Sequence, residues 1–456
     1  MSFTSGQLHD AISSCRRCLP VIPVRYWVAF SGGMDSHVLL HAISDMRDTL
    51  QAELHAVHVN HGLQAQAVDW AVHCRQTCQQ LDIPLTIIDV NAAHERGQSP
   101  EAAARDARYA ALAELLVEGD VLMTGQHARD QAETFLLQSL RGAGPRGLSA
   151  MPSMSTLGKG YLIRPLLSVS YENLEAYAEK QGLEWVDDPS NTDIGFDRNY
   201  LRRTVMPGLR ERWPSLDATL SRVASQQAET ELLLAEMAQQ DSEGLIDRAS
   251  SLDMPGVSAL SLPRQRNVLR YWLSELGLAL PSSRKLEQLQ RDMFNAAEDR
   301  NPHIEWQGVE VRRYRGRLYA MRPLGEFDDN VRLDWKPGKP LVLPGEAGKL
   351  LSRPVQGGGV CLGVDEDLHA ELRFRHGGES CRPQGKNHHT SLKKLFQQAG
   401  IPPWQRNRTP LLFVGDELAA IPGLCICEPY VAAAGKTGFE LDWQPAITEA
   451  GELTGF

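Results

Sequence analysis

The sequence has few cysteines and no long apolar run. Eight cysteines among 456 residues are too few for a disulfide scaffold, so reduced thiols are expected. No run reaches the roughly eighteen apolar residues of a membrane span, and the polar, mixed segment from Met1 to Pro20 lacks a signal-peptide pattern. We therefore expect a cytoplasmic protein with no membrane partner. Its 42% hydrophobic and 23% charged residues are typical of a soluble globular protein.

Two or three domains are expected, because 456 residues exceed one ordinary hydrophobic core. Strand and helix patterns alternate through the N-terminal part, which predicts right-handed βαβ units and an α/β fold with a doubly wound parallel sheet. Amphipathic helices dominate past Trp213, and a stretch rich in Pro, Gly and Asp at 323–348 precedes short strand patterns. We predict an α/β domain at 1–213, a mainly helical domain at 214–325 and a small α+β domain at 341–447.

The expected strands of the first domain are 26–30, 54–59, 85–90, 120–125 and 161–166, and its expected helices are 37–43, 70–81, 99–117, 130–140 and 172–181. The later helices are expected at 216–237, 263–276, 284–294 and 391–399, with strands within 304–321 that turn at Arg315-Gly316. Ligands of doubly wound sheets lie at the carboxyl ends of the strands, where Ser31, His58 and His127 fall.

A glycine turn joins the first strand to the first helix of this pattern. It reads Ser31-Gly32-Gly33-Met34-Asp35-Ser36. The two glycines let a ligand approach bare backbone, and successive N–H groups at a helix start form an anion site. Ser31 and Ser36 add hydroxyl donors, and Asp35 can hold the magnesium that accompanies polyphosphate. A plain βα turn is the alternative.

The turn is neither a Walker loop nor a G-x-G-x-x-G dinucleotide fingerprint. It resembles the pyrophosphate loop (PP-loop) of AMP-forming ATPases, whose pattern is S-G-G-x-D-S. The resemblance implies a fold like that of the adenine nucleotide α-hydrolases and ATP cleaved between its α and β phosphates. The residues expected to bind ATP are Ser31, Gly32, Gly33, Met34, Asp35, Ser36 and His58, with Asp35 as the Mg²⁺ ligand.

Acidic and basic side chains cluster where strands end. Asp130 and Glu133 share the first turn of a predicted helix that His127 precedes. They either complement the helix dipole or hold an ammonium group or magnesium. Arg105 and Arg108 lie on the two helical turns that follow Glu101, and they are either solvated or clamp a phosphate or an oxyanion.

Two basic segments stand out from a net charge of −10. Arg198, Arg202 and Arg203 fall on nearly one helical face, which favours a polyanion. From Arg373 to Arg408, eight Lys and Arg face one Glu, so this segment carries +7 and the remaining chain −17. Phe396 and Trp404 interleave these charges, as expected where an RNA backbone is bound and aromatic rings stack on bases or sugars. The candidate contacts in this segment are Arg373, Arg375, Arg382, Lys386, Lys393, Lys394, Trp404 and Arg406.

The cysteines give a weaker signal. Cys15-x-x-Cys18 has the spacing of zinc and redox sites, but no second such pair completes a metal site. Cys74 and Cys78 have another spacing, as do Cys425 and Cys427. We therefore predict that all eight cysteines are structural.

Taken together, the motifs resemble the tRNA(Ile)-lysidine synthetase family. They are SGGMDS at Ser31, HVNHGL at His58, EAAARDARY at Glu101, GQHARDQAET at Gly125, DDPSN at Asp187, DRNYLRR at Asp197 and SLKKLFQQAGIPPWQRNRTPLLFVGDELAAIPG at Ser391. The resemblance spans nearly the whole chain. It implies that ATP adenylates C2 of the wobble cytidine in the CAU anticodon of tRNA(Ile), and that the ε-amine of free L-lysine then displaces AMP to form lysidine.

Residue roles follow as hypotheses. Asp35 positions Mg²⁺, Arg105 or Arg108 stabilises phosphoryl oxygens, and His127 contacts the adenylate or the base. Asp130 and Glu133 would hold lysine and help deprotonate its amine.

Three other functions stay open: a PP-loop tRNA cytidine thiolase, which needs cysteines at the active site; a glutamine-dependent amidotransferase, although no glutaminase signature is present; and a non-catalytic RNA- or nucleotide-binding protein. The oligomeric state is open as well, with a homodimer as one expectation.

Overall fold

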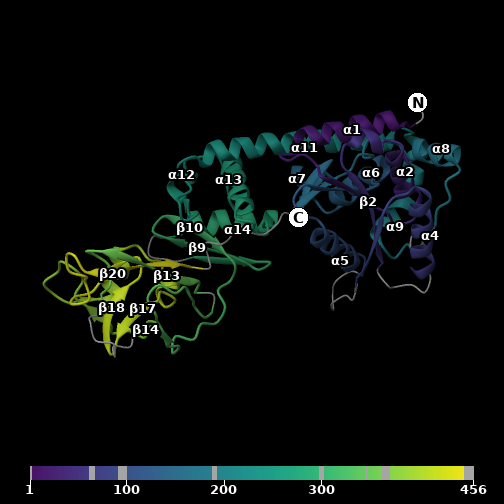
Figure 1. The fold of residues 1–456 in the computed structure, drawn as a ribbon. Helices are drawn as coiled ribbons and strands as arrows, with labels where there is room; N and C mark the ends of the chain where they lie inside the picture. The colour runs from purple at the N-terminus through teal and green to yellow at the C-terminus, as the bar shows by residue number, and fades with distance from the viewer. Residues whose placement is uncertain are drawn as a thin grey trace. The chain divides into compact units, whose positions relative to one another are not determined.

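The computed structural model describes residues 3–60, 67–90, 100–186, 193–296, 302–345, 347–361 and 370–445. The chain forms two compact units that divide within the long helix α11 (Leu216–Ser242), between Leu234 and Ala235 (Figure 1). Among the described residues, no helix is long and apolar enough to cross a membrane.

The first unit is built on a six-stranded sheet with the order β3-β2-β1-β4-β6-β5. All neighbouring strands pair in parallel except β5, which is antiparallel to β6. The strands are β1 (Arg25–Ala29), β2 (Glu53–Asn60), β3 (Leu85–Asp89), β4 (Asp120–Met123), β5 (Met154–Leu157) and β6 (Gly160–Ile163). The predicted doubly wound sheet is confirmed, and β5 is an additional strand that forms a short hairpin with β6.

Helices cover both faces of this sheet because side chains alternate along its strands. Tyr26 and Val28 of β1 pack in a core with α1, α2 and α8, whereas Trp27 packs in the other core with α5. The remaining bounds are α1 (Ser5–Cys18), α2 (Met34–Ser44), α3 (Arg47–Leu50), α4 (Ala67–Gln80), α5 (Pro100–Leu115), α6 (Ala128–Leu140), α7 (Pro145–Leu148), α8 (Tyr171–Gln181), α9 (Asp197–Tyr200), a π-helical turn (Leu201–Val205) and α10 (Met206–Arg212).

The second unit begins with helices packed on a four-stranded antiparallel sheet of order β7-β10-β9-β8. Trp272 and Leu289 lie fully buried between helices and sheet. As predicted, the β9–β10 hairpin turns at Arg315 and Gly316, both with positive φ. The bounds are β7 (Leu252–Asp253), α12 (Met254–Ser258), α13 (Leu262–Glu275), α14 (Ser283–Phe294), β8 (His303–Trp306), β9 (Val309–Tyr314) and β10 (Arg317–Met321).

Among its described residues, this unit also contains three small antiparallel sheets and the short helices α15 and α16. One sheet has the order β11-β14-β17-β18-β19, the second β12-β13-β20, and the third pairs β15 with β16. The bounds are β11 (Leu333–Asp334), β12 (Leu341–Val342), β13 (Lys349–Gln356), β14 (Ala370–Arg373), β15 (Ser380–Cys381), β16 (Thr390–Ser391), α15 (Leu392–Gln398), α16 (Pro403–Arg406), β17 (Leu411–Val414), β18 (Glu417–Ile421), β19 (Cys425–Ile426) and β20 (Thr437–Gln444).

Candidate nucleotide and lysine site

The strand order places the candidate site at the carboxyl ends of β1 and β4. The chain leaves β1 towards β2 on one side and leaves β4 towards β6 on the other, so the strand order reverses between these two central strands, where doubly wound sheets bind their ligands. The turn Ser31–Ser36 follows β1, and His127 follows β4. The two sequence motifs therefore meet at one place.

The glycine turn has the conformation that the sequence predicted. Gly32 adopts φ +87°, and an added Cβ there would lie 3.3 Å from Cys74 Sγ. Ser36 Oγ accepts from the Ser31 amide at 3.2 Å and donates to the Gly33 carbonyl at 2.9 Å, which closes the turn on the first turn of α2. Helix α2 begins at Met34, and its N-cap Gly33 makes no side-chain cap, so the amides of its first turn remain for an anion.

Gly125 brings the end of β4 against this turn. A Cβ built there would lie 3.0 Å from the backbone carbon and oxygen of Asp35 and 3.1 Å from the Ser36 amide nitrogen. Only a residue without a side chain permits this approach. The distance between the two halves of the site is therefore fixed by backbone contact.

His127 connects Asp35 to Asp130. Its Nε2 lies 3.5 Å from Asp35 Oδ1 and 3.5 Å from Asp130 Oδ2, and its Nδ1 accepts from the Arg129 amide at 3.2 Å as the N-cap of α6. The neutral ring therefore carries its proton on Nε2, facing both carboxylates. Burial disfavours the charged ring, but the interaction with Asp35 and the charge of Asp130 outweigh it and hold the pKa of His127 above its ordinary value.

Two arginines cover the acidic pair. Asp130 Oδ1 accepts from Arg198 Nη2 at 2.9 Å and from Arg202 Nη2 at 3.0 Å. Glu133 is fully buried; its Oε1 accepts from Arg202 Nε at 2.8 Å, and its Oε2 accepts from Arg202 Nη2 at 2.8 Å and from Arg198 Nε at 3.2 Å. Burial favours the neutral acid, but His127 and the two guanidinium groups outweigh it and hold the pKa of Asp130 below its ordinary value.

This arrangement differs from the predicted exposed basic face. Arg198 and Arg202 point to Asp130 and Glu133, whereas Arg203 is exposed. No local sequence pattern indicates this pairing, because more than sixty positions separate the acids from the arginines. The sequence reasoning also missed Tyr171, whose ring centroid lies 5.7 Å from that of His127.

His58 and Cys74 lie behind the glycine turn. His58 is buried, and its Nδ1 donates to the Phe30 carbonyl at 2.9 Å, which leaves Nε2 as an acceptor. Burial lowers the pKa of His58, and Arg108 lowers it further. Cys74 Sγ lies 3.4 Å from His58 Nδ1, and burial raises the pKa of this thiol to about 12. Cys74 therefore stays a protonated, unreactive thiol at neutral pH.

Arg105 and Arg108 are both exposed on α5, but they reach different strand ends. Arg108 acts electrostatically on His58 at the end of β2. The Arg105 guanidinium lies 5.0 Å from the ring centroid of Tyr109 and acts on Arg164, which follows β6. The side chain of Glu101 and the DDPSN motif at 187–191 lie outside the described residues.

The position of the Asp35 carboxylate suits its predicted role as a ligand of Mg²⁺. Its buried Oδ1 makes no hydrogen bond of ordinary geometry among the described residues, since its neighbour His127 Nε2 lies 3.5 Å away, and it lies beside the amides expected to bind phosphate. Carboxylate oxygens are ligands that Mg²⁺ prefers, and such an ion also contacts substrate phosphates. A cation at this oxygen would supply the missing partner.

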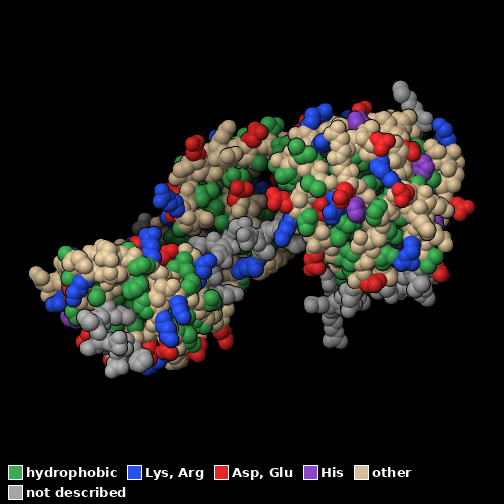
Figure 2. Space-filling model, viewed as in Figure 1, with side chains coloured by type: hydrophobic (Ala, Val, Ile, Leu, Met, Phe, Trp, Pro, Cys, Tyr) green, Lys and Arg blue, Asp and Glu red, His purple; other side chains and the backbone are tan. Residues whose placement is uncertain are grey.

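The basic segment of the second unit divides into two groups. Arg382, Lys386, Lys393 and Lys394 are exposed. The other arginines contact protein groups: Arg373 donates to Glu371 and Gly415, and Arg375 donates weakly to Asn407. On the face drawn in Figure 2, Lys and Arg side chains lie scattered among apolar and acidic ones over this part of the chain. Phe396 is fully buried, so the expectation that it stacks on bases is wrong.

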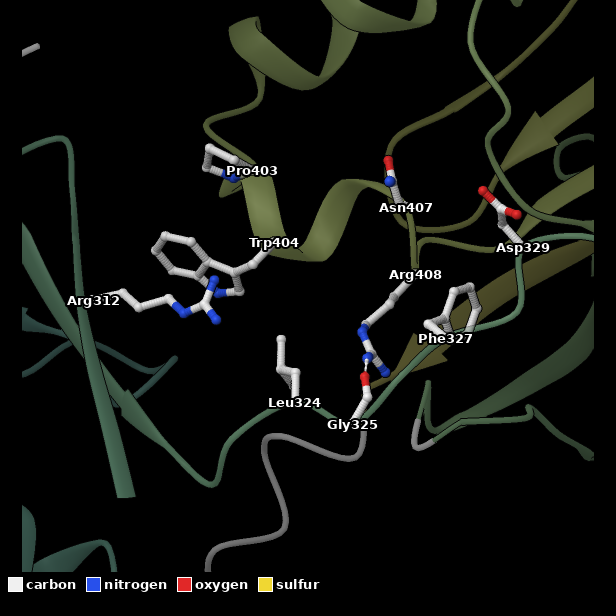
Figure 3. A pocket seen from close by; sticks show the side chains of 9 residues that line it. All are labelled: Arg312, Leu324, Gly325, Phe327, Asp329, Pro403, Trp404, Asn407 and Arg408. Carbon is white, nitrogen blue, oxygen red and sulfur yellow. Dashed lines mark hydrogen bonds between the residues drawn. The ribbon is translucent and has the colours of Figure 1, made fainter. Parts of the chain in front are cut away.

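Trp404 and Arg406 contact the β9–β10 hairpin. Arg406 donates to the Tyr314 hydroxyl at 3.0 Å, and the Arg312 guanidinium lies 5.4 Å from the Trp404 ring centroid. Figure 3 shows Trp404 and Arg312 side by side at the edge of a pocket of about 280 Å³. The predicted base-stacking Trp404 is therefore half-buried in an internal contact, with one side open to this pocket.

Three family models match the chain. Residues 14–209 match a PP-loop domain, residues 252–319 a TilS substrate binding domain and residues 370–443 a TilS substrate C-terminal domain. Each match lies within one of the three predicted domains, whose boundaries stay a prediction.

Two relatives are similar over almost their whole length. The tRNA(Ile)-lysidine synthase of Coxiella burnetii is 44% identical over 92% of this chain and 93% of its own. That of Methylococcus capsulatus is 39% identical over 92% of this chain and 96% of its own. Among solved structures, the U34-tRNA thiolase NcsA from Methanococcus maripaludis is 16% identical, with a TM-score of 0.42 over 49% of this chain and 79% of its own.

Proposed function

Because this chain belongs to the tRNA(Ile)-lysidine synthase family, we propose that it is an AMP-forming carbon–nitrogen ligase acting on the CAU anticodon of tRNA(Ile). It joins the ε-amine of free L-lysine to C2 of the wobble cytidine through an adenylated cytidine. Lysidine pairs with A rather than G, so codon reading changes from AUG to AUA. The contact of Asp35 with His127, between the ATP loop and the acidic pair, is the observation that carries this proposal.

In the first step, the C2 oxygen of cytidine attacks the α-phosphorus of ATP and pyrophosphate leaves. The amides at Gly32 and Gly33, with the Ser31 and Ser36 hydroxyls, hold the leaving pyrophosphate. His58 Nε2 accepts a hydrogen bond from the nucleotide. Arg108 lowers the pKa of His58 electrostatically, whereas Arg105 has this effect on Arg164. Arg108 is therefore the arginine better placed to contact phosphoryl oxygens beside His58.

Asp35 is the residue that would hold Mg²⁺ through its unpartnered Oδ1. The ion would offset negative charge on the polyphosphate when bound. Asp35 remains 3.5 Å from His127 Nε2, so the imidazole orients this carboxylate towards the loop.

In the second step, the lysine amine attacks C2 of the adenylated cytidine and AMP leaves. Asp130 and Glu133 would hold the lysine ammonium and help to remove its proton. The lowered pKa of Asp130 keeps that carboxylate ionised, which suits ammonium binding better than proton abstraction. Arg198 and Arg202 keep the two acids in place and offer their outer N–H groups to the lysine carboxylate.

The exposed lysines and arginines would bind the tRNA backbone. Arg382, Lys386, Lys393 and Lys394 lie on one small domain and are exposed. Arg203 is the exposed member of the first basic cluster. We place the reaction in the cytoplasm with its substrates, and a homodimer stays a prediction.

The thiolase alternative needs a reactive thiol at the ATP loop, and the cysteine that lies there does not fit this role. Cys74 adjoins the ATP loop, but burial raises its pKa to about 12.

The half-reactions test the ligase: with ATP and a CAU-anticodon transcript, pyrophosphate should appear without lysine, and AMP should appear after lysine is added. AMP release triggered by a sulfur donor instead of lysine would contradict the proposal.

A further inference from the structure

Three cysteines that are distant in sequence meet in the C-terminal part of the second unit. The sulfur atoms of Cys381, Cys425 and Cys427 all lie within 4.8 Å of one another. All three are free thiols; Cys381 and Cys427 are buried and Cys425 is half-buried. Two of the residues are two positions apart, and the third lies more than forty positions earlier, so the sequence spacing concealed the group.

Backbone pairing explains how the group forms. Cys381 ends β15, and residues 382–389 form the loop that returns to β16. This loop runs beside the segment after β19: Gln384 donates to the Ile426 carbonyl at 2.9 Å, and Glu428 donates to the Arg382 carbonyl at 2.8 Å. Cys427 forms an isolated bridge with Pro383, which brings its sulfur towards that of Cys381.

We propose that Cys381, Cys425 and Cys427 bind a structural zinc ion, with His389 as the fourth ligand. Thiolates of a tetrahedral zinc site lie about 3.8 Å apart, since each Zn–S bond is about 2.3 Å long. The three sulfur atoms, all within 4.8 Å of one another, can reach this arrangement by small side-chain adjustments. Soft sulfur ligands select zinc over magnesium or calcium. His389 lies outside this group of three sulfur atoms, but it directly precedes Thr390, which pairs with Cys381, so a rotation of its exposed side chain would bring it to the ion.

The ion would stabilise the surface that carries the exposed basic residues. The loop closed by Cys381 and Thr390 bears Arg382 and Lys386. Cys381 and Cys427 pack in the same core as Leu392 and Phe396 of α15, the helix that presents Lys393 and Lys394. The zinc site is independent of the ligase reaction, which takes place in the other unit.

Metal analysis of the full chain tests the proposal. Protein grown with added zinc and purified without chelator should carry stoichiometric zinc, and Co²⁺ in its place should give a sulfur-to-cobalt charge-transfer band. Cys381→Ser, Cys425→Ser and Cys427→Ser should each lose metal and band, and His389→Ala should bind cobalt more weakly. The matched control is Cys361→Ser, a half-buried cysteine of the same part, which should change neither.

Three results would overturn the zinc site. The first is wild-type chain that takes up neither zinc nor cobalt under these conditions, a result that does not depend on whether the variants fold. The second is a disulfide between two of the three cysteines in the intact mass of unreduced, freshly purified protein. The third is unchanged metal content in the Cys427→Ser variant. Unchanged cobalt affinity in His389→Ala would remove that residue as the fourth ligand.

Discussion

His127 Nε2 lies 3.5 Å from Asp35 Oδ1, so the residue that follows β4 contacts the first turn of the helix that follows β1. This contact joins the candidate ATP loop to the acidic pair on α6. We therefore expect substitutions in the loop to impair adenylation and substitutions in the acidic pair to impair lysine transfer.

Replacing Asp35 should stop the first step. Asp35→Asn removes the charge that would hold magnesium and keeps the shape, so pyrophosphate release should fall by about 10²–10³-fold, as when one transition-state contact is lost. The control is Asp48→Asn, an exposed aspartate in the neighbouring helix α3. Pyrophosphate release near the wild-type rate in Asp35→Asn would contradict the assigned role.

Gly125→Ala should separate the two halves of the site. The new Cβ would lie 3.0 Å from the Asp35 backbone, so β4 or α2 must shift, at a cost of about 1–3 kcal/mol in unfolding free energy. Urea unfolding and ATP binding measure the two effects. Gly144→Ala, where no atom lies within 4 Å of the added Cβ, should leave both unchanged. Equal behaviour of the two variants would show that the close approach is unimportant.

Glu133→Gln should impair lysine transfer more than adenylation. The substitution removes the buried charge that two arginines contact, so the free energy of unfolding should fall by about 3 kcal/mol. This value is near the low end for a broken buried ion pair because Arg202 is one-third exposed. AMP release after lysine addition should require far more lysine, while pyrophosphate release continues. The control Glu172→Gln removes an ion pair whose acid is two-thirds exposed. Loss of both half-reactions in equal measure, in folded protein, would argue against a lysine-specific role.

Asp130 should make stability depend on pH in the acidic range. Its pKa is lower in the folded chain than its ordinary value, so its stabilising effect is complete above the unfolded value of about 3.9 and is lost as pH falls through the folded value. Thermal unfolding from pH 7 downward should therefore show a smaller drop below pH of about 4 for Asp130→Asn than for wild type. Asp82→Asn, at a fully exposed site, should follow the wild-type curve. A drop of the same size in Asp130→Asn and wild type would exclude this pKa shift.

The exposed lysines of α15 should contribute to the salt dependence of tRNA binding. Lys393→Gln and Lys394→Gln should each lower the slope of log affinity against log salt by about one, because each lysine displaces counterions from a phosphate. Lys336→Gln, another exposed lysine of the second unit, serves as the control. An unchanged slope in both α15 variants would place the tRNA on another surface.

The sequence predicted the elements with strong local signals. The SGGMDS turn could be predicted because its position between strand and helix requires a residue with positive φ, and Gly32 provides it. The β9–β10 turn could be predicted for the same reason, since Gly316 also has positive φ. Helix α1 was missed because its segment is polar and mixed, although Thr4 and Gln7 form a capping box. Strand β5 was missed because its four residues acquire their pairing only from β6.

Long-range pairings were beyond sequence reasoning. Arg198 and Arg202 suited a polyanion by their spacing, and only the fold shows that Asp130 and Glu133 lie opposite them. Likewise, Cys381 is more than forty positions from Cys425, so no local spacing signalled their contact. Local motifs predict which chemistry is present, whereas charge neutralisation between distant elements depends on the packed structure.

The most direct measurement is transfer of labelled lysine to an unmodified CAU-anticodon tRNA(Ile) transcript with ATP and Mg²⁺. We expect acid-insoluble label at the wobble cytidine, resistant to the mild alkali that removes an aminoacyl ester, with AMP released in equal amount. Label absent from the RNA while ATP is still cleaved to AMP would contradict lysine as the nucleophile.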